Sequence, residues 1–385
     1  MNPLYEQMPT SVFERMSLAA ARHEAVNLGQ GFPDFGWPEE ILEAAAKAVV
    51  SGSNQYSPSR GLPVLRKAVA DHYNRHHGLA LGPDHVCVTS GATEAIAASL
   101  FAALQPGDEV IVLTPAYDAY APLIRQAGGV VREVALQPPL WRIDQAVIEA
   151  AVTDRTRAIM LNNPHNPTGR LFDREELEAV AAVACDRDLL VISDEVWEHV
   201  LLDGQAFTPI ASLPGMAGRT LKVGSAGKIF SLTGWKIGWL VADPRLATLA
   251  ARAHQFLTFS SAPNLQTAVA FGLEEGDAWL NPMRRGFASA RNRMSGDLRR
   301  MGFAVLDSAA TYFMCVDLRA SGIDVDDETF AAAAVEQAGV AVVPLSPFAE
   351  ANPPSHMIRL CFAKREETIA AGIEALGRAR ALFVS

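Results

Sequence analysis

Four short segments carry residue types that could do chemistry together. Pro164–Gly169 (PHNPTG) follows one expected strand, Asp194 ends a second, and Ser225–Lys228 (SAGK) follows a third. Gly91–Thr93 (GAT) opens an expected helix directly after a fourth strand. If these strands run in one direction, their carboxyl ends bring a helix N-terminus, an amide, a carboxylate and an amine to one edge of the sheet.

Each segment has an ordinary structural explanation when it is taken alone. Gly91–Thr93 can be a helix cap, PHNPTG a turn, Asp194 a cap at a strand end, and Lys228 a surface lysine. Together they match the needs of pyridoxal phosphate, whose phosphate suits helix N-terminal amides and whose aldehyde condenses with a lysine. A carboxylate keeps its ring nitrogen protonated, and its phenolic oxygen accepts hydrogen bonds. The chain has six lysines, so few positions could supply the amine.

The elements that must position these residues alternate between short apolar runs and longer helical stretches. Because apolar strands that alternate with helices are typical of sheets covered on both faces, we expect an α/β fold with a mainly parallel central sheet flanked by helices. The expected strands are 86–89, 109–113, 130–136, 157–163, 189–194, 220–226 and 237–243.

The pattern changes after about residue 275. A long Arg-rich helical stretch leads to shorter strand candidates, and the chain closes with a helix over 365–383. We therefore predict a large cofactor-binding domain over 31–275 and a smaller α+β domain formed by 1–30 and 276–385. The expected strands of the smaller domain are 303–307, 312–318, 340–346 and 357–363.

Composition excludes several classes of partner. With 33 Lys+Arg against 43 Asp+Glu the net charge is −10, which argues against binding to nucleic acid or to an anionic membrane. No apolar run of about 18 residues is free of charges and breaks, and the first residues lack the signal-peptide pattern. The four cysteines and nine histidines show no metal-ligand spacing. We expect a cytoplasmic protein without a metal.

Seven motifs resemble those of the fold-type I, class I/II pyridoxal-phosphate aminotransferases. In the order of that family they are VNLGQGFPDF, NQYSPSRGLPVLRKA, VTSGATEAI, NNPHNPTGR, SDEVWEHV, SAGKIFSLTGWKIGW and MIRLCFA. The LGQGFPDF and GKIFSLTGWKIGW segments resemble most the kynurenine aminotransferase and glutamine transaminase K branch. VFERMSLAA and AHQFLTFS are similar to the bacterial methionine aminotransferases of that branch.

The resemblance implies roles at the cofactor. It assigns Lys228 as the lysine that bonds covalently to the cofactor, Asp194 as the partner of the ring nitrogen and Asn166 as a hydrogen-bond partner of the phenolic oxygen. Tyr117 should stack on the ring. The implied phosphate ligands are Gly91, Ala92, Thr93, Ser225 and Lys236, with Tyr56 crossing from the neighbouring subunit of a homodimer.

The resemblance also implies a substrate site. Arg359 matches the arginine that clamps the α-carboxylate, and its planar guanidinium suits such a bidentate contact. Gly31 would let the substrate approach the backbone closely. The pocket candidates are mostly apolar or aromatic, namely Phe13, Met16, Phe32, Tyr120 and Phe348. No further arginine stands at a motif position to bind a second carboxylate, so we expect a donor of the methionine, aromatic, kynurenine or glutamine type. The expected reaction moves the amino group of an L-amino acid to a 2-oxo acid in a ping-pong cycle.

One position departs from the family. Trp197 stands three residues after Asp194, where the family usually has tyrosine. An indole N–H donates one hydrogen bond but cannot accept or ionise as a phenol does. We therefore count Trp197 as a cofactor neighbour, with core packing as the alternative.

Three other functions stay open. A carbon–sulfur β-lyase, acting on cystathionine or a cysteine S-conjugate, would use the same cofactor. A non-catalytic regulator could use the same fold, although the 385 residues include no appended DNA-binding segment. A nicotinamide dehydrogenase is the weakest alternative, because no dinucleotide fingerprint follows a strand.

Overall fold

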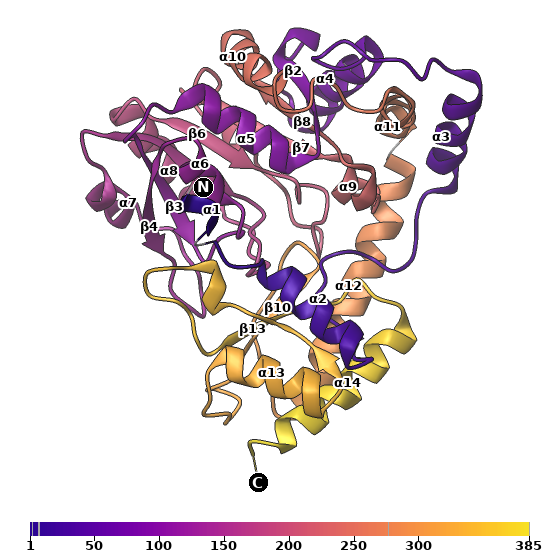
Figure 1. The fold of residues 1–385 in the computed structure, drawn as a ribbon, viewed down its shortest axis with the longest axis vertical. Coiled ribbons are helices and arrows are strands. Elements are labelled where there is room, and N and C mark those ends of the chain that lie inside the picture. Colours follow the sequence, from indigo (N-terminus) through magenta and orange to yellow (C-terminus); the bar gives the residue numbers. More distant parts are fainter. Residues whose placement is uncertain (2, 7, 276, 385) are drawn as a thin grey trace.

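The structure is a computed structural model that describes residues 1, 3–6, 8–275 and 277–384. A seven-stranded sheet forms its centre, and all seven strands predicted for this region are present (Figure 1). Across the sheet their order is β2 (Val86–Ser90), β8 (Ile237–Ala242), β7 (Thr220–Ser225), β6 (Leu190–Asp194), β5 (Thr156–Asn162), β3 (Glu109–Thr114) and β4 (Val130–Ala135).

Six of these seven strands run in one direction, and β8 runs in the opposite direction. It pairs antiparallel with both β2 and β7, while β3, β4, β5, β6 and β7 pair in parallel. Since β2 and β7 are both antiparallel to β8, they share one direction. The four strands that precede the chemical segments therefore end at the same edge of the sheet, as predicted.

Both faces of the sheet are covered, which explains why its strands are apolar throughout. Alternate residues point to opposite faces: Val110 and Val112 pack in the core that contains α5 (Ala92–Ala103), and Ile111 and Leu113 pack in the core that contains α8 (Arg174–Asp186). The other helices of this region are α3 (Glu39–Ser51), α4 (Pro63–His77), α6 (Tyr120–Gln126), α7 (Gln145–Ala151), α9 (Ala226–Ile229), α10 (Pro244–His254) and α11 (Pro263–Glu275).

The last part of the chain builds a second, smaller layer. An antiparallel sheet has the order β12 (Val343–Pro344), β13 (Met357–Cys361), β10 (Phe313–Asp317) and β9 (Ala304–Val305). The N-terminal segment lies against this part of the chain, because β1 (Val26–Asn27) pairs in parallel with β11 (Val340–Ala341) in a separate two-stranded sheet. The predicted division into two domains, with its boundaries, stays a prediction.

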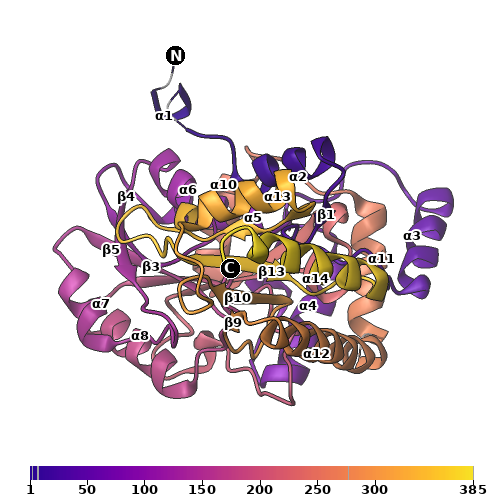
Figure 2. The ribbon, with the colours of Figure 1, turned by 90° about the horizontal axis from the view of Figure 1, so that it is seen from below.

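Helices cover the smaller layer. They are α2 (Val12–Arg22), α12 (Asp277–Arg300), α13 (Asp327–Gln337) and α14 (Glu366–Ala381), and α12 packs against α14 (Figure 2). The short elements are α1 (Pro3–Glu6) and the 3-10 turns η1 (Pro83–His85), η2 (Ile210–Ser212), η3 (Thr233–Trp235) and η4 (Ser346–Phe348). Within the described residues, no helix has the length and apolar character needed to cross a membrane.

Candidate active site

A cavity of about 330 Å³ lies at the carboxyl ends of the strands and is bordered on one side by Phe313 and Arg359 of the smaller layer. Most of the site residues predicted from the sequence line it; the exceptions are Tyr56, Phe348, Met16, Phe32 and Tyr120. The chain thus brings Phe13 and Gly31 from its beginning, the strand-end segments from its middle and Arg359 from its end to one place.

Lys228 enters this cavity from α9, directly after β7. Ser225 begins the helix, since its hydroxyl accepts a hydrogen bond from the Gly227 N–H at 3.2 Å. Burial lowers the pKa of the Lys228 amine from 10.5 to about 8, and the charge of Arg359 acts in the same direction. The amine therefore has a substantial neutral fraction near pH 8, which a nucleophile or a proton acceptor requires.

Asp194 ends β6, and its carboxylate is held from two sides. The Tyr120 hydroxyl donates to Oδ2 at 2.6 Å, and the Val196 N–H donates to Oδ1 at 3.3 Å. Burial raises the pKa of Asp194, while the Tyr120 hydrogen bond and the charge of Lys228 oppose that rise. A buried carboxylate in this position can pair with a cationic ring nitrogen.

The N-terminus of α5 forms an anion cradle. Gly91 is the N-cap with a positive φ of 79°, and no side chain caps the helix. A Cβ on Gly91 would lie 3.0 Å from Lys236 Nζ, and one on Gly238 would lie 2.6 Å from the Gly91 carbonyl carbon. The two glycines let β8 and the start of α5 approach closely, which places the Lys236 ammonium beside the helix N-terminus.

Arg359 lies on β13 with its guanidinium fixed by both hydrogen bonds and rings. Nη1 donates to Asn166 Oδ1 at 2.7 Å, and Nη2 donates to the Gly29 carbonyl at 3.0 Å. The Phe313 ring centre lies 3.8 Å from its central carbon and the Phe13 ring centre 4.8 Å. Burial lowers its pKa to about 10, so it remains cationic at neutral pH.

The remaining predicted residues lie elsewhere. Tyr56 is 86% exposed and packs edge-on against Phe259, away from the cavity of its own chain. Phe348 lies behind the cavity wall, with its ring centre 5.6 Å from that of Phe13. Three further pocket candidates also lie outside the cavity lining: Met16, buried in α2; Phe32, which is exposed; and Tyr120, which bonds Asp194.

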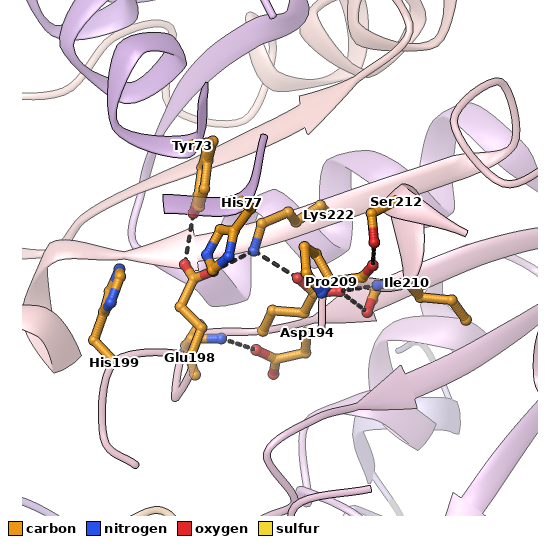
Figure 3. Close-up of polar contacts among 12 residues, drawn as sticks. Tyr73, His77, Asp194, Glu198, His199, Pro209, Ile210, Ser212 and Lys222 are labelled. Carbon is orange, nitrogen blue, oxygen red and sulfur yellow. Dashed lines mark hydrogen bonds and ion pairs between the residues drawn. The ribbon is translucent and has the colours of Figure 1, made fainter. Parts of the chain in front are cut away.

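The sequence reading missed a buried ionic cluster behind Asp194. Lys222 Nζ donates to both Glu195 Oε2 and Glu198 Oε2 at 2.6 Å, and the three side chains are each 1% exposed. The Tyr73 hydroxyl donates to Glu198 Oε1 at 2.7 Å, and His77 approaches the same carboxylate (Figure 3). A signal was present, because a lysine inside an apolar strand needs carboxylate partners.

A second missed residue is Tyr312, immediately before β10. Its hydroxyl lies 3.2 Å from Lys228 Nζ. Nothing in the sequence around Tyr312 distinguishes it from an ordinary core tyrosine.

Comparison with known proteins agrees with this geometry. The model of the family "Aminotransferase class I and II" matches residues 23–376. A probable N-succinyldiaminopimelate aminotransferase of Mycobacterium tuberculosis is 42% identical over 379 residues, 95% of each chain. The Escherichia coli methionine aminotransferase is 38% identical over 371 residues, 96% of each chain.

The fold comparison gives the same result. The solved N-succinyldiaminopimelate aminotransferase structure from M. tuberculosis superposes with a TM-score of 0.94 at 41% identity, covering 98% of this chain and 99% of the other. The predicted fold type I is therefore confirmed, and so is the predicted enzyme class. The chain belongs to the class I and II aminotransferases, a family of pyridoxal-phosphate-dependent enzymes.

Proposed function

We propose that this aminotransferase holds pyridoxal phosphate in the cavity between the strand ends and Arg359. The observation that carries the proposal is that the amine of Lys228, the carboxylate of Asp194 and the uncapped N-terminus of α5 all line one cavity. These are the three groups that the cofactor's aldehyde, ring nitrogen and phosphate require.

The residues of the cavity fit that cofactor. The cradle at Gly91 combines helix N-terminal N–H groups with the Lys236 ammonium, which suits a phosphate dianion. Asn166 lines the cavity and accepts a hydrogen bond from Arg359, so its amide can contact both the cofactor and the substrate. Tyr117 lines the same cavity and offers a ring for stacking. The volume of about 330 Å³ lies within the range of small-ligand pockets.

Each side chain then has a task in amino-group transfer. When bound, pyridoxal phosphate supplies an aldehyde that takes up the amino group and a ring that withdraws electrons from the substrate Cα. Lys228 holds the cofactor and, once free, accepts the proton from Cα through Nζ. Asp194 keeps a proton on the ring nitrogen, and Arg359 orients the substrate carboxylate.

The surroundings of Arg359 favour an apolar or aromatic donor. Phe13 and Phe313 line the cavity, and Phe348 supports Phe13 from behind. We therefore infer donors of the methionine, aromatic, kynurenine or glutamine type. N-succinyldiaminopimelate is the second candidate, because the M. tuberculosis relative named for it is 42% identical over 95% of this chain.

We also propose that the enzyme is a homodimer in the cytoplasm. The exposed ring of Tyr56, which the family resemblance assigns to a neighbouring active site, supports the dimer. The four free cysteines support a reducing compartment.

An absorption spectrum tests the cofactor proposal. Wild-type protein mixed with pyridoxal phosphate should gain a visible band that methionine converts to a near-ultraviolet band and that a 2-oxo acid restores. Lys228→Ala should lose the band, whereas Lys67→Ala, which changes an exposed lysine paired with Asp71, should keep it. A colourless protein that takes up no pyridoxal phosphate would overturn the proposal.

A donor panel then tests the substrate. The purified enzyme is supplied with 2-oxoglutarate and, in turn, methionine, phenylalanine, kynurenine, glutamine or N-succinyldiaminopimelate, and the 2-oxo acid product is measured. The highest kcat/KM with an apolar or aromatic donor supports the first inference, and the highest value with the succinylated donor supports the second. Release of pyruvate and a thiol from cystathionine when no 2-oxo acid is added as acceptor would identify the lyase instead.

A further inference from the structure

The phenol of Tyr312 lies beside the Lys228 amine, although position 197, where the family usually has tyrosine, carries an indole. Tyr312 approaches from the smaller layer, 84 residues away from Lys228 in the chain, and is 1% exposed. Lys228 Nζ donates to its hydroxyl oxygen at 3.2 Å and lies 3.5 Å from the Gly31 carbonyl. The amine thus has two oxygen acceptors, the Tyr312 hydroxyl and the Gly31 carbonyl.

The hydrogen bonds of Tyr312 fix its role. Its hydroxyl donates to the Gly31 carbonyl at 2.6 Å, so its one hydrogen is used and its lone pairs face the amine. Burial raises the pKa of Tyr312 well above its ordinary value, which keeps the hydroxyl protonated. Tyr312 therefore acts as an acceptor, and an acceptor stabilises the ammonium form of Lys228.

Trp197 completes the environment of the amine. Its ring centre lies 4.6 Å from Lys228 Nζ, within the range of a cation–π contact. The same indole packs edge-on against the Tyr312 ring at 4.5 Å, and Phe287 packs on Tyr312 at 5.7 Å. These contacts hold the Tyr312 ring, so that its hydroxyl can lie only close to Gly31 and the amine.

The Gly31 segment also connects the amine to Arg359. Arg359 donates to the Gly29 carbonyl at 3.0 Å, and Tyr312 donates to the Gly31 carbonyl two residues later. A Cβ on Gly31 would lie 2.8 Å from the Phe313 ring, so this segment packs directly on the strand that follows Tyr312. The group that moves the proton and the group that holds the carboxylate are thus anchored to one backbone segment.

We propose that Tyr312 is a positioning residue for Lys228. It holds the ε-amino group of the lysine beside Gly31 whenever the lysine is not bonded to the cofactor, and Trp197 packs against the Tyr312 ring and keeps it in place. This inference rests on the proposed function, which makes Lys228 the lysine that moves the proton at Cα. The phenol that position 197 lacks is supplied from a different element, on the substrate side of the amine.

The first test measures the pKa of Lys228 without the cofactor. The full chain is labelled with lysine carrying carbon-13 at Cε, and the resonances of the six lysines are titrated, with Lys228→Ala assigning the one of interest. Tyr312→Phe should lower the pKa of Lys228 by about one unit, because the charged form loses a hydrogen bond. Tyr73→Phe removes another buried phenol, bonded to Glu198, and should leave it unchanged.

Trp197→Phe provides a second variant that does not depend on the folding of Tyr312→Phe. It keeps the Tyr312 hydroxyl but weakens the cation–π contact, so it should lower the Lys228 pKa by less than Tyr312→Phe. An unchanged pKa in a folded Tyr312→Phe protein would overturn the proposal. If that variant does not fold, an unchanged pKa in Trp197→Phe would do the same.

The second test uses the loaded enzyme and methionine. Tyr312→Phe should lower kcat by about tenfold with little change in KM, and should enlarge the kinetic isotope effect for methionine deuterated at Cα. Equal isotope effects in the two enzymes would contradict a role in placing Nζ. Because the carbon-13 titration needs no cofactor, a wild-type protein that binds no pyridoxal phosphate would refute the proposed function without deciding the pKa result.

Discussion

At the scale of single residues, Arg359 combines a fixed direction with a retained charge. Its Nη1 and Nη2 groups already bond Asn166 and Gly29, and the Phe13 and Phe313 rings flank the guanidinium. Arginine is less strongly hydrated than an ammonium group and can donate from several N–H groups at once, so it tolerates this burial. A cation held in one orientation can receive a carboxylate without first reorganising.

We predict that Arg359→Lys will lower kcat/KM for methionine by about 10- to 100-fold, because an ammonium group cannot reproduce the planar fork. Cofactor affinity, measured by spectral titration, should stay near that of the wild type. Arg15→Lys is the control, since Arg15 pairs with Glu328 at the surface. A kcat/KM for Arg359→Lys equal to that of the control would show that the fork is not used.

Residue chemistry predicted part of this site and missed part of it. Lys228, Asp194 and the Gly91 segment lie at or just after the ends of strands that meet at one edge of the sheet. Their residue types and positions in the sequence were therefore enough to predict that they lie together. Tyr312 reaches Lys228 only because two layers fold together, and no local spacing encodes a contact between residues 84 positions apart.

At the scale of elements, the segment after β6 is fixed from behind. It begins directly after Asp194, the last residue of β6, and its Glu195 and Glu198 bond Lys222 of the adjacent strand β7. Burial opposes the ionisation of Glu198, yet the charge of Lys222 lowers its pKa well below the ordinary value. The cluster therefore ties the Asp194 segment to the strand that leads into Lys228.

We predict that Lys222→Met will reduce the free energy of unfolding by about 3–5 kcal/mol at neutral pH, because two carboxylates are left buried without their cation. The loss should shrink as the pH falls below the ordinary glutamate value of 4.5, because the wild type then loses the stability that comes from the lowered pKa of Glu198. Urea unfolding at several pH values measures both effects.

Lys67→Met is the matched control, since Lys67 pairs with Asp71 on the surface and its loss should change stability little. A Lys222→Met protein as stable as Lys67→Met at pH 7 would contradict the anchoring role. The sequence placed Lys222 correctly in a strand. Its partners could not be predicted without the register that sets β6 beside β7.

The strands themselves were predictable because burial on both faces leaves a nearly continuous apolar signal. The direction of β8 was not predictable, since Ile237–Ala242 is as apolar as the parallel strands. The β1–β11 pair joins segments from opposite ends of the chain, and no strand was expected at β1. β9 and β11 are shorter than the expected strands 303–307 and 340–346.

At the scale of the whole molecule, one edge carries an apolar surface that the single chain leaves open. Helices α3 and α11 lie side by side there (Figures 1 and 2). They border a groove of about 830 Å³, which we call the α3–α11 groove, lined by Lys47, Ser51, Tyr56, Pro263, Asn264 and Phe271 among others. Exposed apolar side chains of α3 include Val49 and Val50. Such a surface is typical of an interface between subunits.

We predict that Val50→Asp will convert the proposed dimer into monomers. Val50 is 86% exposed in the single chain, and a carboxylate buried in an apolar interface lacks a partner. The mass in solution, measured by sedimentation velocity at micromolar protein, should fall by half. Cofactor affinity should fall with it if Tyr56 completes the neighbouring site.

Leu140→Asp is the control for this change. Leu140 is also exposed and lies between β4 and α7 in the chain. Figure 1 shows these two elements on the opposite side of the molecule from α3. It should leave both mass and cofactor affinity unchanged. A wild-type protein that sediments as a monomer, or a Val50→Asp protein that stays dimeric like Leu140→Asp, would mean that the α3–α11 groove is not the interface between subunits.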